Sequence, residues 1–143
     1  GKMVQPAKIA EPHSMPVTIF CIREGIRQLR AVVARKRAAR PLWRGVKNVT
    51  VGSDFFRDGG GVEVAPMSTS YSLETAVQYS MSPCSVIFKL VRSSFMEQGA
   101  DLDWLSAFPM EEECLFPPLT FLSATGRRQT IGSFTIVEVA PRL

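Results

Sequence analysis

Three consecutive glutamates, Glu111, Glu112 and Glu113, are the residues whose types and spacing most clearly suggest chemistry. They follow a proline-containing stretch and lead directly into the apolar segment 114–118, which is typical of a strand entering a core. Because successive side chains of a strand point to opposite faces, an extended chain would place Glu111 and Glu113 together and Glu112 apart. Two carboxylates on one cleft wall can stabilise positive charge on a sugar and bind or deprotonate a second group. A solvated acidic loop is the alternative.

A second candidate is Arg44, which lies between Trp43 and Gly45 in the strand-like segment 41–46. A cation in a short apolar strand must be paired or face a ligand, and a planar guanidinium suits phosphate oxygens. The adjacent glycine would let a ligand approach closely. A structural ion pair at a strand end is the alternative.

A third candidate is the hydroxyl segment Ser68, Thr69 and Ser70, which stands where a predicted strand, 62–66, leads into a predicted helix, 72–80. Serine and threonine at such junctions commonly cap helices or close turns. Nucleophilic catalysis by serine needs a general base, and the single histidine lies far away in a proline-flanked N-terminal stretch. A serine nucleophile is therefore not supported.

The elements that must position these residues follow from the hydrophobic periodicity. Apolar residues recur at helical spacing from about Ile19 to Ala39 and arginines line the other face, which predicts a basic amphipathic helix ending before Pro41. Later segments predict one short helix, 72–80 with Ser72 as N-cap, among many strands. The predicted strands are 41–46, 62–66, 85–91, 101–106, 113–116, 120–124 and 134–139, with 125–132 as a hairpin-like turn. This order indicates an α+β domain with an N-terminal helix and a β-sandwich-like core.

Length and composition indicate one domain. The chain has 143 residues, of which 45% are hydrophobic and 21% charged, enough for a single hydrophobic core. We expect residues 1–17 to form an N-terminal arm or linker and residues 18–143 to form the domain. No apolar run approaches the roughly 20 residues that span a bilayer, and no signal peptide is visible, so we expect a soluble protein and favour an intracellular one.

Metal and nucleic-acid functions find little support. Cys21, Cys84 and Cys114 lack the paired spacing of zinc sites, and the only histidine is His13, so we expect no metal. We expect the cysteines to be buried as small hydrophobic residues. Segment 23–47 holds nine basic residues and one acid. It fits a solvated helix face, an acidic partner or a membrane surface. No aromatic residues are interleaved among the helix arginines for base stacking, so we expect no nucleic-acid partner.

Together, the three candidates resemble a known enzyme family. An arginine on a strand, a Ser-Thr-Ser strand end before a short helix, and Glu-x-Glu opening a strand are similar to the arginine-serine-glutamate, cholera-toxin-like class of mono-ADP-ribosyltransferases. The matching segments are LWRGV at 42–46, STS at 68–70 and EEECLFPP at 111–118, and the likeness extends to about residue 139. The resemblance implies the ADP-ribosyltransferase fold with its N-terminal helix beside the NAD cleft, and NAD as co-substrate without a metal.

The resemblance also implies a role for each matching residue. Glu113 would be catalytic, binding the 2′-hydroxyl of the nicotinamide ribose, and Glu111 would engage an arginine of an acceptor protein. Arg44 would hold the NAD pyrophosphate, and Ser68 would orient Glu113. Phe108, in the segment that matches the acceptor-recognition loop, would contact the acceptor, with a core position as the alternative. The remaining residues of the NAD pocket would be Trp43, Gly45, Thr69 and Ser70.

The implied reaction is transfer of ADP-ribose from NAD to an arginine of an acceptor protein, with release of nicotinamide. An NAD glycohydrolase that uses water, and an inactive binding module of the same fold, are the alternatives. Glu111 favours transfer to arginine, and the complete Arg, Ser and Glu set favours an enzyme. The short segment 47–61 and the lack of the disulfide framework of secreted vertebrate members are departures. A toxin or effector, or a catalytic module of a larger chain, fits this pattern.

Overall fold

The computed structural model describes residues 15–32, 37 and 39–143, so most of the predicted N-terminal arm lies outside the described residues. The predicted α+β class is confirmed. In chain order the elements are α1 (Pro16–Leu29), η1 (Arg30–Val32), β1 (Leu42–Lys47), α3 (Ser53–Arg57), β2 (Gly60–Glu63), β3 (Met67–Ser70), α4 (Leu73–Ser80), β4 (Ser85–Leu90), η2 (Phe95–Glu97), β5 (Ala100–Asp101), η3 (Pro109–Glu111), β6 (Glu113–Phe116), β7 (Thr120–Ile131) and β8 (Phe134–Arg142).

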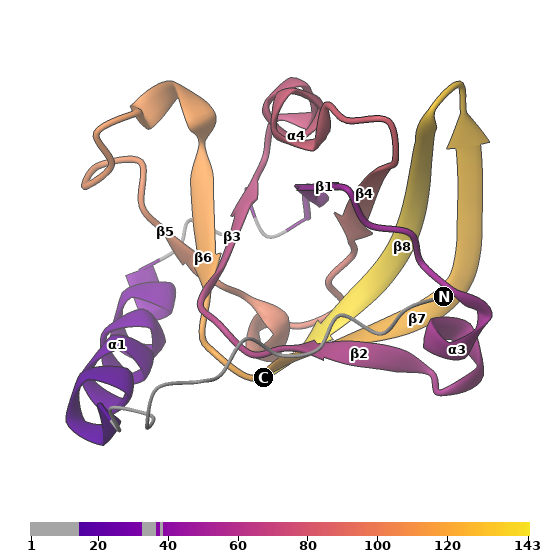
Figure 1. Ribbon diagram of the computed structural model, residues 1–143. Helices are drawn as coiled ribbons and strands as arrows, with labels where there is room; N and C mark the ends of the chain where they lie inside the picture. The colour runs from indigo at the N-terminus through magenta and orange to yellow at the C-terminus, as the bar shows by residue number, and fades with distance from the viewer. Residues whose placement is uncertain (1–14, 33–36, 38) are drawn as a thin grey trace.

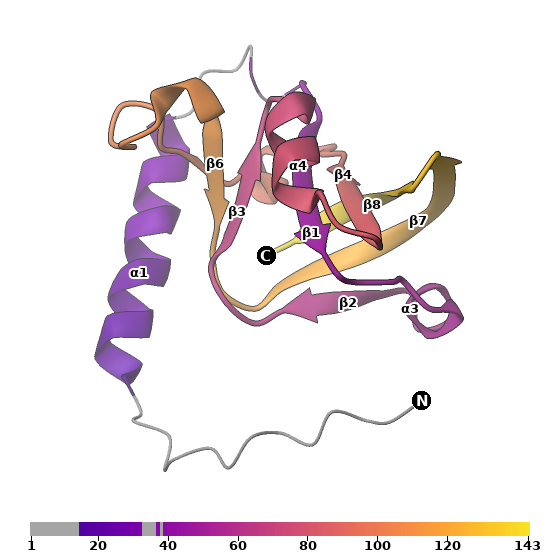
Figure 2. The same cartoon turned by 45° about the horizontal axis from the view of Figure 1, so that its top comes forward.

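The eight strands of the described chain form one hydrogen-bonded sheet in the order β2-β7-β8-β4-β1-β3-β6-β5. Neighbouring strands are antiparallel except for β4 and β8, which run parallel. The sheet bends strongly, so that β2 and β7 pass across the end of the layer that contains β3 and β6 (Figures 1 and 2). This curvature gives the sandwich-like arrangement expected from the sequence.

One hydrophobic core fills the inside of the bend. Leu42 of β1, Met67 of β3 and Phe116 of β6 belong to the same buried cluster as Leu122 of β7 and Val139 of β8. Burial alternates along β6, as expected for a strand with one face in a core. Each such side chain contributes about 1.5–3 kcal/mol by leaving water. The cluster connects β7 and β8 with β1, β3 and β6.

Helix α4 packs closely on β1. Its predicted N-cap is confirmed, because the Ser72 hydroxyl accepts a hydrogen bond from the Thr75 amide at 3.3 Å. A Cβ atom on Gly45 of β1 would lie 1.9 Å from the carbonyl oxygen of Ala76. The missing side chain of Gly45 therefore lets the helix backbone approach, whereas the sequence suggested room for a ligand.

The N-terminal helix differs from its prediction at both ends. Helix α1 begins at Pro16, inside the expected arm, and tightens at Arg30 into the 3-10 turn η1, while Ala39 lies in a turn. Apolar spacing defines a helical face but does not say where the last turn tightens. Of the α1 residues only Ile26 is buried, so most of the apolar face of the helix is exposed.

Two predicted strands are wrong in extent. The strand expected at 62–66 ends at Glu63, and the three hydroxyl residues lie in a separate strand, β3. The segment expected to be a strand at 101–106 contributes only its first residue to β5. The amides of Leu105 and Ser106 donate to the Leu102 carbonyl, which closes a turn there. The prediction was wrong here because polar and apolar residues alternate in this surface turn, which is the pattern typical of a strand.

The hairpin formed by β7 and β8 also differs from its prediction. Strand β7 continues to Ile131 through an irregularity between Ala124 and Arg128, so the turn falls at residues 132–133 and not across 125–132. Gly126 (φ 82°) and Gly132 (φ 59°) both have left-handed backbones. Glycine serves bulges as well as turns, so the sequence does not distinguish the two positions.

The cysteine prediction is confirmed only in part. Cys114 is buried, whereas Cys21 and Cys84 are exposed, and all three are free thiols. Burial raises the pKa of the Cys114 thiol. Among the described residues, none of the helices combines the length and hydrophobicity required for a bilayer-spanning segment.

Candidate active site

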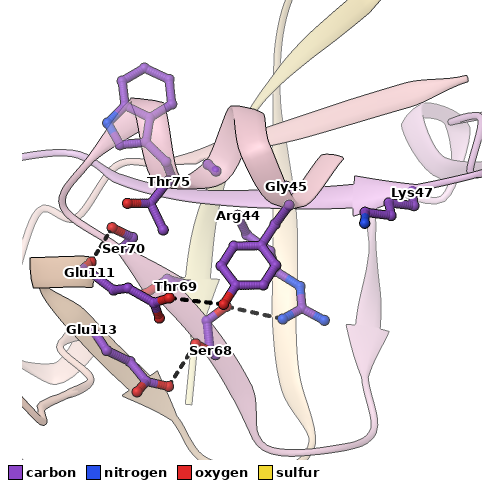
Figure 3. A pocket seen from close by; sticks show the side chains of 12 residues that line it. Arg44, Gly45, Lys47, Ser68, Thr69, Ser70, Thr75, Glu111 and Glu113 are labelled. Carbon is purple, nitrogen blue, oxygen red and sulfur yellow. Dashed lines mark hydrogen bonds between the residues drawn. The ribbon is translucent and has the colours of Figure 1, made fainter. Parts of the chain in front are cut away.

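The predicted site residues gather around one cleft with a volume of about 550 Å³ (Figure 3). Strands β1, β3 and β6, helix α4 and the end of η3 supply its walls. The predicted residues that line it are Trp43, Arg44, Gly45, Ser68, Thr69, Ser70, Glu111 and Glu113.

The hydrogen bond between Ser68 and Glu113 joins two residues that line the cleft. These residues come from the neighbouring antiparallel strands β3 and β6, with Ser68 opposite Leu115 in the register. The Ser68 hydroxyl donates to Oε1 of Glu113 at 2.7 Å. The Leu102 amide donates to the Glu113 carbonyl at 2.9 Å, so both the backbone and the carboxylate of Glu113 are fixed.

The two following hydroxyls connect β3 to the acidic segment. Thr69 Oγ1 donates to the Cys114 carbonyl at 2.6 Å, and the Ser70 hydroxyl donates to the carbonyl of Glu111. Thr69 and Ser70 are buried, at 3% and 5% exposure. Their hydroxyl protons are thus used by the backbone, and both residues support the wall.

The three glutamates do not form the extended segment expected from the sequence. Pro109 opens the 3-10 turn η3, Glu111 ends it, and Glu112 has a left-handed backbone with φ 47° and ψ 52°. Only Glu113 belongs to a strand. Glu111 and Glu113 nevertheless both line the cleft, with their carboxylates pointing towards the side where Arg44 lies (Figure 3). The left-handed residue, and not strand alternation, brings the pair together.

Glu112 points away from the cleft and is held there by two residues. Its Oε1 lies 3.3 Å from Nη1 of Arg40, whose guanidinium stands 5.2 Å from the ring centroid of Tyr71. The Tyr71 amide donates to the Glu112 carbonyl at 3.2 Å. Burial raises the pKa of Tyr71 to about 12, so its phenol stays neutral at physiological pH.

Tyr79 is a site residue that the sequence analysis did not identify. It is 55% exposed and lines the cleft, and its phenol donates to Oε1 of Glu111 at 2.9 Å. This hydrogen bond to a carboxylate raises the pKa of Tyr79. Thr75 and Tyr79 are four residues apart on α4 and line the same cleft. That i, i+4 spacing was the sequence signal that could have found Tyr79.

Arg44 both lines the cleft and forms an ion pair, so the two sequence interpretations coexist. Its Nη1 donates to the Ser68 carbonyl, and its Nη2 contacts Oε2 of Glu63, each at 3.0 Å. The guanidinium therefore links β1, β2 and β3. The sequence analysis did not identify Glu63, because its partner Arg44 is 19 residues away in the sequence. It also did not identify Lys47, the second cation that lines the cleft.

The remaining predicted features lie outside the cleft. Phe108 is 67% exposed, which excludes the core alternative, and its apolar neighbours Trp104, Leu105 and Met110 are also exposed. No described residue of α1 lines the cleft, and the helix stands beyond β5 and β6 (Figure 1). Within residues 15–32, 37 and 39–143, histidine, cysteine and acidic side chains form no group of three or more that could hold a metal ion.

Comparison with known proteins reveals similarity in structure. No protein-family model and no curated protein matches the chain in sequence. HopU1 of Pseudomonas syringae pv. Tomato DC3000, an ADP-ribosyltransferase, aligns over 86% of this chain and 52% of its own, with 20% identity and a TM-score of 0.63. Vis from Vibrio splendidus, solved with agmatine, aligns over 72% and 49%, with 24% identity and a TM-score of 0.54.

A third match is Plx2a, an ADP-ribosyltransferase toxin from Paenibacillus larvae, with 16% identity and a TM-score of 0.54. It aligns over 96% of this chain and 74% of its own. The present chain spans about half the length of the HopU1 and Vis chains. The sheet and these matches agree: the chain has the fold of these ADP-ribosyltransferases.

Proposed function

We propose that the cleft binds NAD and transfers its ADP-ribose group to an arginine side chain of an acceptor protein, releasing nicotinamide. The observation that carries the proposal is the hydrogen bond from Ser68 to Glu113, with Glu111 on the same wall. The three matched ADP-ribosyltransferases support the transfer of ADP-ribose. Agmatine ends in a guanidinium group, so its complex with Vis supports arginine as the acceptor.

Glu113 acts on the sugar in this proposal. The bond between ribose C1′ and the nicotinamide nitrogen breaks, its electron pair neutralises the pyridinium, and the ribose gains oxocarbenium character. A carboxylate beside the 2′-hydroxyl stabilises that positive charge. The Ser68 hydroxyl holds Oε1 of Glu113, so the carboxylate needs little rearrangement during the reaction.

Glu111 acts on the acceptor. A guanidinium nitrogen attacks C1′, forms the new N-glycosidic bond and loses one proton, which the Glu111 carboxylate accepts. Tyr79 occupies Oε1 of Glu111, and within the described residues no hydrogen bond occupies Oε2. The second oxygen is thus available to bind and orient a guanidinium.

Two cations suit the pyrophosphate of NAD. Arg44 and Lys47 both line the cleft and both come from β1. Arg44 already contacts Glu63, so phosphate oxygens would compete with that carboxylate for the guanidinium. Nucleotide binding through Arg44 is expected to weaken as the salt concentration rises.

The acceptor would contact the apolar segment that precedes Glu111. Trp104, Leu105, Phe108 and Met110 are each more than 60% exposed. An exposed apolar group next to the acidic pair can bury surface against a protein that presents an arginine. Because Vis and Plx2a are toxins, we extend the proposal to a toxin or effector that modifies a host protein.

The decisive assay supplies NAD labelled in its ADP-ribose part and measures both free nicotinamide and label on agmatine and on lysate proteins. We expect Glu113→Gln to abolish nicotinamide release and labelling together. Glu111→Gln should lose labelling while it retains nicotinamide release, because only the acceptor step uses that carboxylate. Glu74→Gln, on the exposed side of α4, is the matched control and should change neither.

The possible outcomes separate the alternatives. Absence of nicotinamide release from the unmodified chain would assign an inactive binding module. Release without label on any acceptor would assign an NAD glycohydrolase. Unchanged labelling by Glu111→Gln would contradict the role given to Glu111.

A further inference from the structure

A second concavity, of about 530 Å³, lies between α1 and the turn that joins β6 to β7; we call it the α1 groove. Helix α1 supplies one wall through residues at helical spacing, including Ile19, Phe20 and Ile26. Pro117, Pro118 and Leu119 form the opposite wall. The α1 groove shares no lining residue with the NAD cleft, so its function is separate from the chemistry there.

The apolar groups of the α1 groove are unusually exposed. Phe20 is 65% exposed, Ile19 54% and Leu119 68%. Leu119 also has a left-handed backbone, with φ 66°, which is unfavourable for a leucine. Several large apolar side chains around one concavity are characteristic of an interaction surface, because isolated exposed residues do not form a shared hollow.

The charged residues that line the α1 groove are all positive. Its lining contains Arg23, Arg27 and Arg30 and no aspartate or glutamate. Glu24 pairs with Arg27, and this contact lowers the pKa of Glu24 to about 2, so the pair stays ionised. Arg23 and Arg30 have no acidic partner among the described residues. A complementary ligand therefore combines apolar side chains with carboxylates.

From this complementarity we propose that the α1 groove binds an acidic amphipathic helix of a partner protein. The partner's apolar face would contact the Phe20 side of α1 and the proline wall, and its flanking carboxylates would pair with Arg23 and Arg30. A concave site between two walls fits a helix, whereas a lipid surface requires a protruding apolar face. The proposal does not depend on the transferase activity.

Fluorescence polarisation with two designed peptides tests the proposal. The first peptide has leucines at i, i+3, i+4 and i+7 and glutamates at the flanking positions, and the second has lysines in place of the glutamates. We expect saturable binding of the acidic peptide with a Kd on the order of micromolar, and at least roughly tenfold weaker binding of the basic one. Arg23→Glu combined with Arg30→Glu should reverse this preference.

Two further variants keep the result interpretable. Arg57→Glu with Arg127→Glu makes the same change in net charge on exposed residues outside the groove and should leave peptide preference unchanged. Phe20→Ala should weaken binding of both peptides while thermal unfolding stays unchanged, because Phe20 is already exposed. Failure of the acidic peptide to bind, or equal binding of both peptides, would overturn the proposal. Sedimentation with phosphatidylserine vesicles but no peptide binding would assign a membrane surface instead.

Discussion

At the scale of single residues, each carboxylate of the cleft is oriented by one hydroxyl group from another element. Ser68 of β3 binds Glu113, and Tyr79 of α4 binds Glu111. Each hydroxyl occupies Oε1 of its carboxylate. A change at one hydroxyl should therefore affect one step of the reaction more than the other.

Tyr79→Phe tests this separation, because it removes the hydroxyl and keeps the ring. The lost hydrogen bond contributes about 1 kcal/mol, so we expect roughly a fivefold rise in the KM for agmatine. Nicotinamide release without an acceptor should stay near the level of the unmodified chain, since Glu113 keeps its partner. Equal losses in both assays would show that Tyr79 supports the whole cleft and not the acceptor carboxylate.

The residues of the site were predictable where they form local motifs. Arg44, Ser68, Glu111 and Glu113 stand in short segments with distinctive order. The contact of Glu63 with Arg44 was not predictable, because only the fold brings these two residues near each other. Sequence spacing carries no information on such distant pairs.

At the scale of elements, the backbone of Glu112 matters more than its side chain. Its left-handed conformation joins η3 to β6 and places Glu111 and Glu113 on one wall. The partly exposed contact with Arg40 contributes little by itself, about 0–1 kcal/mol.

A pair of substitutions separates the two contributions. Glu112→Gly keeps the left-handed backbone accessible and should retain nearly full nicotinamide release. Glu112→Val disfavours the left-handed backbone by about 1–2 kcal/mol. It should lower both the rate of nicotinamide release and the free energy of unfolding. Measured rates that are the same for the two variants would contradict a role for the backbone conformation.

The contact between β1 and α4 offers a stability prediction. Gly45→Ala would press a methyl group against the Ala76 carbonyl, and we expect the free energy of unfolding to fall by about 1–3 kcal/mol. Gly25→Ala, in α1, is the control, since a Cβ there meets no atom within 4 Å. It should raise helix stability by about 0.5–1 kcal/mol. In denaturant unfolding, the two variants should change the free energy of unfolding in opposite directions, because only Gly45 is in close contact with α4.

Elements were predictable where a short apolar run ends at clear turn residues. Strands β4 and β6 and helix α4 match their predictions to within one residue. The curved hairpin of β7 and β8 was not predictable, because its bulge and its turn both use glycine. The extent to which α1 is buried was not predictable either, since amphipathic spacing does not specify what covers the apolar face.

At the scale of the whole molecule, both tyrosines of the chain should titrate above the ordinary range. Burial raises the pKa of Tyr71 to about 12, and the bond to Glu111 raises that of Tyr79. The folded state therefore binds more protons than the unfolded state above about pH 10, and this contribution to stability declines as the pH rises through the folded pKa values.

Tyrosinate absorbance during an alkaline titration measures this directly. The native protein should show little ionisation near pH 10, where the chain in concentrated guanidinium chloride is about half ionised. Tyr71→Phe should remove the step near pH 12. Coincident curves for native and unfolded protein would contradict the raised pKa values of both phenols.

The position of β8 has a consequence for how the domain is assembled. It is the last strand of the sheet along the chain, yet it lies between β7 and β4. During synthesis, the strands that carry Arg44, Ser68 and Glu113 emerge first, but β7 and β2 cannot join them until β8 inserts. Folding of the sheet is thus completed by a late central strand, so we expect the cleft walls of β1, β3 and β6 to become stable only after β8 has been synthesised.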